Sequence, residues 1–99
     1  MILFKDYAGQ TVRLTDERRR HLLSHPEMAG LEPLLERAIA APQRVVRSRT
    51  DGTVLLYYRN AFTPQFGAKL LCVVVKHILT DSFVITAYLT DKIKVGETL

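Results

Sequence analysis

The sequence has little of the chemistry that several protein classes require. It contains a single cysteine, Cys72, so no internal disulfide can form, which favours a fold held by packing in a reducing compartment. No apolar run approaches the roughly 20 residues of a membrane-spanning helix, and the apolar start, residues 1–4, is too short for a signal peptide. We therefore expect a cytoplasmic protein with no membrane partner.

Motifs of fixed spacing are also missing. There is no glycine-rich phosphate loop, which argues against nucleotide hydrolysis, and no Gly-x-Ser-x-Gly for a nucleophilic serine. His21 and His25 have the i, i+4 spacing of a zinc pair, but no third ligand is evident. We therefore predict neither a metal site nor a cofactor.

The residues that are present fit an ordinary globular domain. Of the 99 residues, 47% are hydrophobic and 24% charged, with five glycines and four prolines. This composition excludes collagen, disordered tails and low-complexity arrays. With no repeat and no linker-like stretch, residues 1–99 are predicted to form a single domain.

The net charge of +4 is concentrated in the middle of the chain. Residues 1–42 carry six basic and six acidic side chains, whereas residues 43–80 carry six basic side chains against Asp51 alone. A one-sided positive field attracts polyanions, so RNA, DNA or an acidic protein is an expected partner.

Helical signals lie in the first half of the sequence, after two short predicted strands at 2–5 and 10–14. Thr15 followed by Asp16 and Glu17 predicts a helix start, and Pro26 requires that helix to stop by His25. Apolar residues at helical spacing from Leu31 to Ile39 predict a second helix.

From residue 43 onward the pattern changes to strands. Arg44–Arg49 and Thr53–Arg59 flank an Asp-Gly pair that favours a tight hairpin. Leu70–His77 is a nearly continuous apolar run, and Phe83–Thr90 alternates, with Phe83, Ile85, Ala87 and Leu89 expected beneath the helices. Residues 60–67 are expected to be the longest loop of the sheet. The predicted fold is α+β: two N-terminal helices on one face of a four- to six-stranded antiparallel sheet.

Several side chains could together cleave RNA without a metal. That reaction needs a base for the ribose 2′-hydroxyl, cations for the phosphate and an acid for the leaving oxygen. His25 is a candidate base or acid, although it could equally cap its helix. Arg59 and Lys76 would stabilise the phosphate, and Tyr88 or Thr86 would orient it. This hypothesis requires all of these groups to face one cleft.

The basic hairpin offers a second kind of site. Arg44, Arg47 and Arg49 could grip phosphates, and Tyr58 could stack on a base. A non-catalytic module that binds nucleic acid or an acidic partner through this hairpin is therefore an alternative to the enzyme. A third reading is a small interaction domain that dimerises through an open sheet face or a free edge strand.

Several short strings follow one another between residues 11 and 97: Arg13-Leu14-Thr15, His21, His25-Pro26-Glu27-Met28, the helix over Leu31 to Ile39, Tyr57-Tyr58-Arg59, Val73-Val74-Val75-Lys76 and Thr86-Ala87-Tyr88-Leu89-Thr90-Asp91-Lys92. In this order they resemble the phage-associated PBECR-type nucleases, part of the superfamily named after barnase, EndoU, colicins and RelE. The resemblance implies two helices on a four-stranded antiparallel sheet, metal-independent RNA cleavage, and a toxin paired with an antitoxin. By position it matches His25 to a helix-end histidine, Arg59 and Lys76 to basic strand residues, and Thr86 with Tyr88 to hydroxyls of the last strand.

Overall fold

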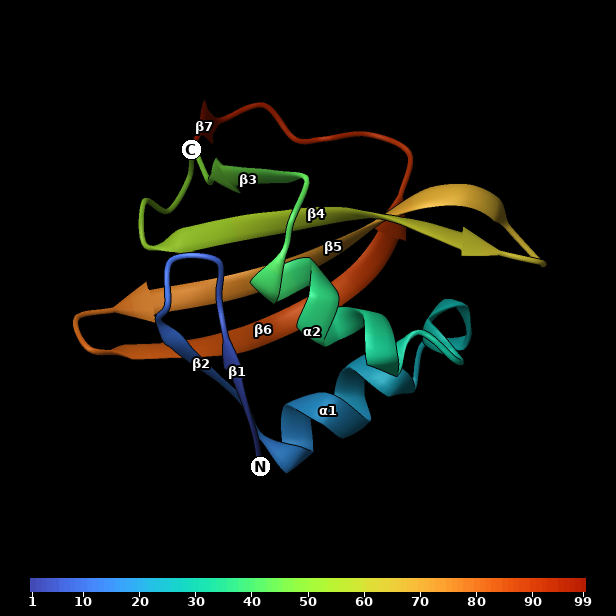
Figure 1. The fold of residues 1–99 in the computed structure, drawn as a ribbon, viewed down its shortest axis with the longest axis horizontal. Coiled ribbons are helices and arrows are strands. Elements are labelled where there is room, and N and C mark those ends of the chain that lie inside the picture. The colour runs from blue at the N-terminus through green and yellow to red at the C-terminus, as the bar shows by residue number, and fades with distance from the viewer.

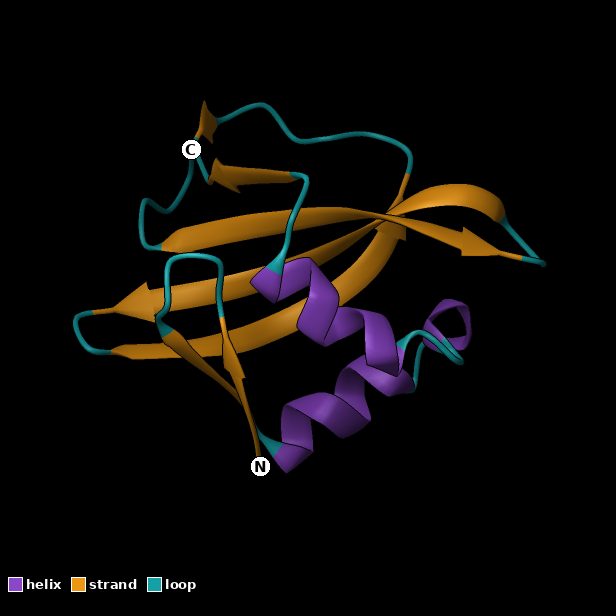
Figure 2. Cartoon of the chain, in the orientation of Figure 1, coloured by secondary structure: helices purple, strands orange, loops and turns teal.

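A computed structural model describes residues 1–99 as a seven-stranded sheet, with two α-helices and a short 3₁₀ helix lying across one of its faces (Figures 1 and 2). The elements follow in the order β1 (Ile2–Lys5), β2 (Thr11–Leu14), α1 (Asp16–Leu23), η1 (Pro26–Met28), α2 (Glu32–Ala40), β3 (Arg44–Arg47), β4 (Val54–Thr63), β5 (Gly67–Ile78), β6 (Asp81–Thr90) and β7 (Glu97–Thr98).

The two helices form where the sequence places them. Thr15 caps α1, because its hydroxyl oxygen accepts a hydrogen bond from the Arg18 backbone N–H at 3.2 Å. The helix ends at Leu23, ahead of Pro26, which begins η1. In α2 the apolar stripe buries its side chains against the sheet. Both helices thereby anchor one sheet face.

The predicted four- to six-stranded antiparallel sheet is wrong in strand number and in direction. The strand order is β1-β2-β6-β5-β4-β3-β7, and β2 runs parallel to β6 while the other neighbours are antiparallel. The N-terminal hairpin joins the sheet through this parallel contact of Arg13 with Phe83, and Glu97–Thr98 adds a strand at the other edge. A strand's own sequence pattern does not specify its neighbour, so these additions were not predicted.

Two predicted connections also differ from the structure. β4 continues through Thr63 and pairs with β5 along its whole length, so the expected loop at 60–67 shrinks to a turn at residues 64–66. The expected tight Asp-Gly hairpin is instead a six-residue turn, residues 48–53, between Arg47 and Val54. Below, this segment is called the β3–β4 turn.

Each face of the sheet has its own core. The helix face carries the larger one, a cluster of 17 buried residues that includes Leu22, Met28, Leu35 and Leu71. On the opposite face Val46, Leu56, Tyr58 and Cys72 are buried beneath residues 91–96. We call residues 91–96 the tail, and the side of the sheet that they cover the tail face. Figure 1 shows the tail running back from the end of β6 to β7.

A β-bulge determines which side chains of β6 reach the helices. The register of β5 against β6 shifts between Val74 and Val75, so that Val84 rather than Phe83 faces the helix-side core. The predicted face for Phe83 is therefore wrong, whereas Ala87 does pack beneath the helices. No helix of the chain is long and apolar enough to span a membrane.

Candidate active site

The residues predicted to form one catalytic cleft lie on two faces of the sheet. His25 follows α1 and precedes Met28, both of which pack on the helix face. Its imidazole lies edge-on to that of His21, with ring centroids 5.4 Å apart, and makes no hydrogen bond. Arg59 also faces the helix side, because it alternates with buried Tyr58, and its guanidinium donates to the Ala41 carbonyl at 2.6 Å.

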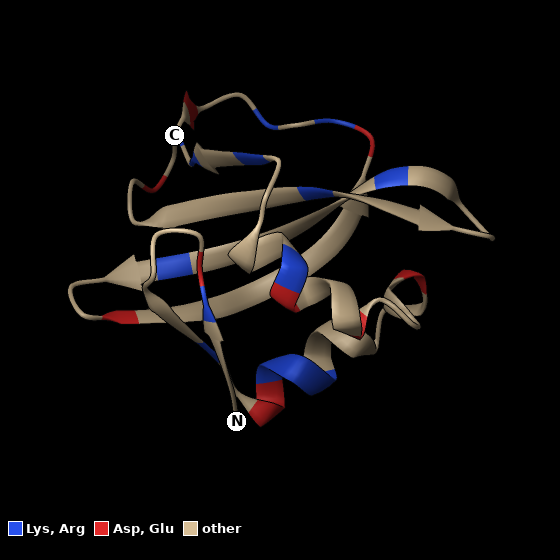
Figure 3. Ribbon diagram, viewed as in Figure 1, with Lys and Arg blue, Asp and Glu red and all other residues tan.

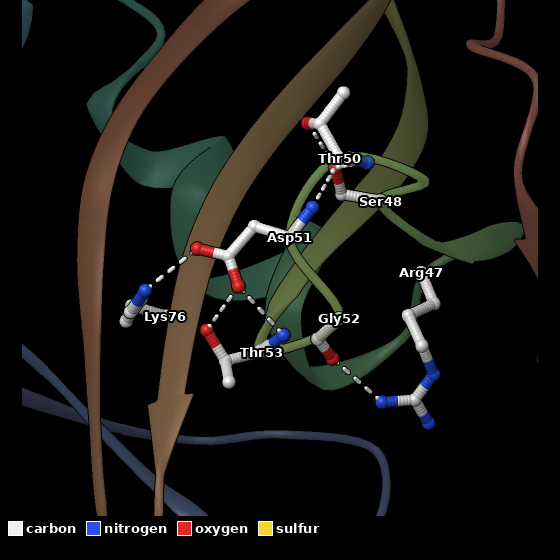
Figure 4. A network of polar contacts seen from close by, with 7 residues as sticks. All are labelled: Arg47, Ser48, Thr50, Asp51, Gly52, Thr53 and Lys76. Carbon is white, nitrogen blue, oxygen red and sulfur yellow. Dashed lines mark hydrogen bonds and ion pairs between the residues drawn. The ribbon is translucent and has the colours of Figure 1, made fainter.

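Lys76, Thr86 and Tyr88 lie on the tail face instead. The Lys76 ammonium is bonded to the Asp51 carboxylate at 2.7 Å, in the β3–β4 turn (Figure 4). Tyr88 is paired with buried Cys72, and burial raises the pKa of its phenol. Since the sheet separates these groups from His25 and Arg59, the expected common cleft does not form.

The basic hairpin is only partly free to bind. Arg47 donates to Glu97 at 2.9 Å and to the Gly52 carbonyl at 2.9 Å. Arg44 and Arg49 are exposed and form no ion pair. Tyr58 is completely buried, and its hydroxyl accepts the Lys94 N–H at 3.0 Å, so it cannot stack on a base. The expectation for Tyr58 fails because the tail covers this face.

A polar relay that sequence reasoning did not assemble lies on the helix face, where Ser82, His77, Tyr57 and Asp6 form a continuous chain of hydrogen bonds. The Ser82 hydroxyl is 2.7 Å from His77 Nδ1, and His77 Nε2 is 3.0 Å from the Tyr57 hydroxyl. Tyr57 in turn donates to Asp6 Oδ2 at 2.9 Å. We call these four residues the relay.

The direction of each hydrogen bond in the relay follows from the carboxylate at its Asp6 end. A carboxylate oxygen only accepts, so the single proton of Tyr57 is committed to Asp6. His77 Nε2 must then carry a proton and donate it to the Tyr57 oxygen, which leaves Nδ1 with a free electron pair. The Ser82 hydroxyl therefore donates to Nδ1. This assignment makes His77 a neutral base that polarises Ser82.

Four separate strands position the relay. Asp6 directly follows β1, and its Oδ1 accepts the backbone N–H groups of Ala8 at 2.9 Å and Gln10 at 2.8 Å, which fixes the carboxylate. Tyr57 comes from the middle of β4, while His77 and Ser82 are direct cross-strand partners in β5 and β6. Burial of His77 lowers the pKa of its imidazole, and the nearby charge of Arg47 lowers it further, against an opposing effect of Asp6. The imidazole is therefore neutral at physiological pH.

Ser82, at one end of the relay, is 7% exposed and borders a surface hollow of about 340 Å³. The residues that line it are Gln10, Thr11, Leu79, Thr80 and Ser82. Leu79 is fully exposed and has a positive φ of 50°, which places the β5–β6 turn in a strained conformation beside the hollow. Lys5 does not line the hollow, but it donates to the hydroxyl of the lining residue Thr11 at 2.8 Å. Hydroxyl and amide groups thus surround a polarised serine.

Comparison of the chain with known protein-family models, with curated proteins and with solved structures found no significant match. No three His, Cys, Asp or Glu side chains come together in the fold as a metal site would require. The chemistry of the site is therefore argued from the relay itself.

The sequence contained one signal for the relay. His77 and Ser82 flank the four residues 78–81, and a two-residue turn within that segment would make them cross-strand partners. Leu79-Thr80 lacks the glycine or asparagine that usually marks such a turn, so the register was not evident. Asp6 and Tyr57 are 51 residues apart, and nothing in their local patterns connects them.

Proposed function

We propose that the chain is a metal-independent ribonuclease whose proton-transfer centre is the relay rather than His25. The observation that carries this proposal is the hydrogen bond from Ser82, which borders a hollow, to the neutral and partly buried imidazole of His77. A base held by a second partner, with its pKa set by burial, is what general base catalysis requires.

The choice of substrate rests on charge and on the resemblance to PBECR-type nucleases. The chain carries a net charge of +4, and Figure 3 shows basic residues over α1, the central strands and the tail. A field of this sign attracts a polyanion more strongly than a small molecule with one negative charge. RNA supplies its own nucleophile in the ribose 2′-hydroxyl, so no serine ester with the substrate is needed.

The relay gives the reaction a balanced path for the proton. A 2′-hydroxyl in the hollow passes its proton to Ser82 Oγ, while Ser82 passes its own to His77 Nδ1. The 2′-oxygen then bonds to phosphorus as the bond from phosphorus to the 5′-oxygen breaks. The protonated His77 returns its proton through Ser82 to the departing 5′-oxygen, which restores the neutral imidazole. The products are a 2′,3′-cyclic phosphate and a free 5′-hydroxyl. Lys5, which is hydrogen-bonded to the lining residue Thr11, offsets charge on the phosphate.

The decisive experiment measures the rate of RNA cleavage in EDTA by purified wild-type protein and by variants of the relay and of His25. His77→Gln should slow cleavage by about 10²-fold or more, because the base is lost. Ser82→Ala should slow it similarly, whereas His25→Gln, on the same sheet face but outside the relay, should leave the rate unchanged. Circular dichroism and thermal unfolding check that each variant is folded. If His25→Gln abolishes cleavage and His77→Gln does not, the relay is not the centre.

A second candidate is binding of nucleic acid without cleavage. It is favoured by the free guanidinium groups of Arg44 and Arg49 and by the dispersal of the residues expected to form one cleft. Folded wild-type protein that binds RNA with steep salt dependence but never cuts it would select this candidate and reject the ribonuclease.

A further inference from the structure

A second hollow, also of about 340 Å³, lies on the tail face. The β3–β4 turn supplies Ser48, Arg49 and Thr50 to its lining, the tail supplies Lys94 and Val95, and Leu56 completes it from β4. We call it the turn–tail pocket. It shares no lining residue with the hollow beside Ser82.

The charge of the turn–tail pocket is entirely positive. Arg49 and Lys94 are exposed and form no ion pair, and no acidic residue lines the pocket. The one acid of the turn, Asp51, is held elsewhere: its carboxylate accepts from Lys76 at 2.7 Å and from the Thr53 hydroxyl at 2.6 Å. Figure 4 shows this carboxylate directed away from Ser48 and Thr50. Two cations are thus left without a counter-charge in one concave site.

The turn also presents a hydroxyl donor to the same space. Ser48 Oγ accepts the backbone N–H groups of Thr50 at 3.3 Å and Asp51 at 3.4 Å, and lies 3.1 Å from Thr50 Oγ1. With its acceptor sites occupied, Ser48 donates to Thr50, which leaves the Thr50 proton uncommitted. Two cations and a hydroxyl donor suit the oxygens of a phosphodiester, and Leu56 with Val95 offers apolar surface to the adjoining sugar.

The turn–tail pocket connects structurally to the relay. The His77 backbone N–H donates to the Thr53 carbonyl at 2.7 Å, so the β3–β4 turn that lines the pocket also packs against the strand that carries the base.

We propose that the turn–tail pocket binds a backbone phosphate of single-stranded nucleic acid, through Arg49, Lys94 and Thr50. The choice of nucleic acid as the ligand rests on the proposed ribonuclease function, but binding here needs no cleavage. The pocket serves to position the strand and makes no contact with the reacting atoms.

The test measures binding of a short fluorescent 2′-O-methyl oligoribonucleotide, which has no 2′-hydroxyl to be cleaved, by anisotropy over a salt series. The double variant Arg49→Gln/Lys94→Gln should lower the slope of log affinity against log salt by about 0.7, the value for one lost phosphate contact on a single strand. Thr50→Val should weaken binding about tenfold without changing the slope, because it removes a hydrogen bond and no charge.

The matched control is Arg20→Gln/Arg37→Gln, which removes the same charge from two exposed, unpaired helical positions. An equal change in slope for both double variants would show general attraction and overturn the pocket. Displacement of the oligonucleotide by a poly-glutamate peptide as readily as by unlabelled oligonucleotide would assign the pocket to an acidic protein, and would also overturn the proposal. Because cleavage is not measured, failure here leaves the assay of His77 and Ser82 unaffected, and the reverse also holds.

Discussion

The two faces of the sheet bury polar groups in different ways. On the helix face, four side chains from distant parts of the chain satisfy one another around His77, within reach of the larger core. On the tail face, Tyr58 hydrogen-bonds to the backbone of the thin tail, and the charged groups stay at the rim. The difference shows that the helix face, with its larger core, holds a neutral base, whereas the thinly covered tail face keeps cations available to a ligand.

The largest effect expected from this comparison concerns the two cores. Leu71→Ala, in the 17-residue cluster, should cost the upper part of the usual range of about 2–5 kcal/mol in free energy of unfolding. Leu56→Ala, in the four-residue cluster, should cost the lower part, because the tail can close over the space. Urea unfolding of both variants measures the difference. Equal losses would contradict the expectation that the larger core of the helix face contributes more to stability.

Removal of the two buried phenol hydroxyls should also distinguish the faces. Tyr57→Phe removes one hydrogen bond from Asp6 and one from His77, so we expect a loss of about 1–3 kcal/mol in free energy of unfolding. The other hydrogen bonds of these two residues remain. Tyr58→Phe frees only the Lys94 N–H of the tail, which water can reach, and should cost about 1 kcal/mol or less. A larger loss for Tyr58→Phe, again by urea unfolding, would reverse the comparison.

The pH dependence of stability should depend on His77. Because burial holds its folded-state pKa below the ordinary value of about 6.5, protons bind the unfolded chain first as pH falls. The contribution of neutral His77 is thus fully present above about pH 6.5 and is lost as pH falls through the lowered folded-state pKa. His77→Gln should lack this loss, and the gap between the two stability curves between pH 7 and pH 5 measures it. Parallel curves would show that burial does not hold the imidazole neutral.

Local sequence patterns predicted the two helices but did not predict which strands are neighbours in the sheet. A helix cap such as Thr15, and an apolar stripe such as that of α2, depend only on residues a few positions apart. Capping and periodicity therefore located both helices. Strand neighbours depend on contacts across the whole chain. The parallel placement of β2 beside β6, and the tail over Tyr58, had no local signature.

The candidate site shows the same limit. The sequence predicted His25 as the base because it lies beside a proline at a helix end. The polar side chains that orient an imidazole and set its proton position surround His77 instead. Those partners belong to β1, β4 and β6, whose register a sequence pattern does not provide. A one-residue shift at the bulge near Val74 was enough to change which side chains of β6 face the helices.

The smallest expected effect lies at the tail-face rim, in the contact of Asp51 with Lys76. The hydrogen bond from Lys76, with two more from Thr53, lowers the pKa of the Asp51 carboxyl. The contact therefore stabilises the folded state above about pH 4 and ceases to do so as pH falls toward that lowered pKa. Asp51→Asn should be slightly less stable than the wild type at pH 7, and the gap should close on acidification. Lys76→Met removes the ion pair but keeps both Thr53 bonds, so its gap should be smaller. High salt should narrow both gaps, because the pair is partly exposed and screened. A gap that persists unchanged to pH 2 would mean that the carboxylate charge does not hold the β3–β4 turn, and the turn–tail pocket would then lose the feature that keeps its one acid turned away.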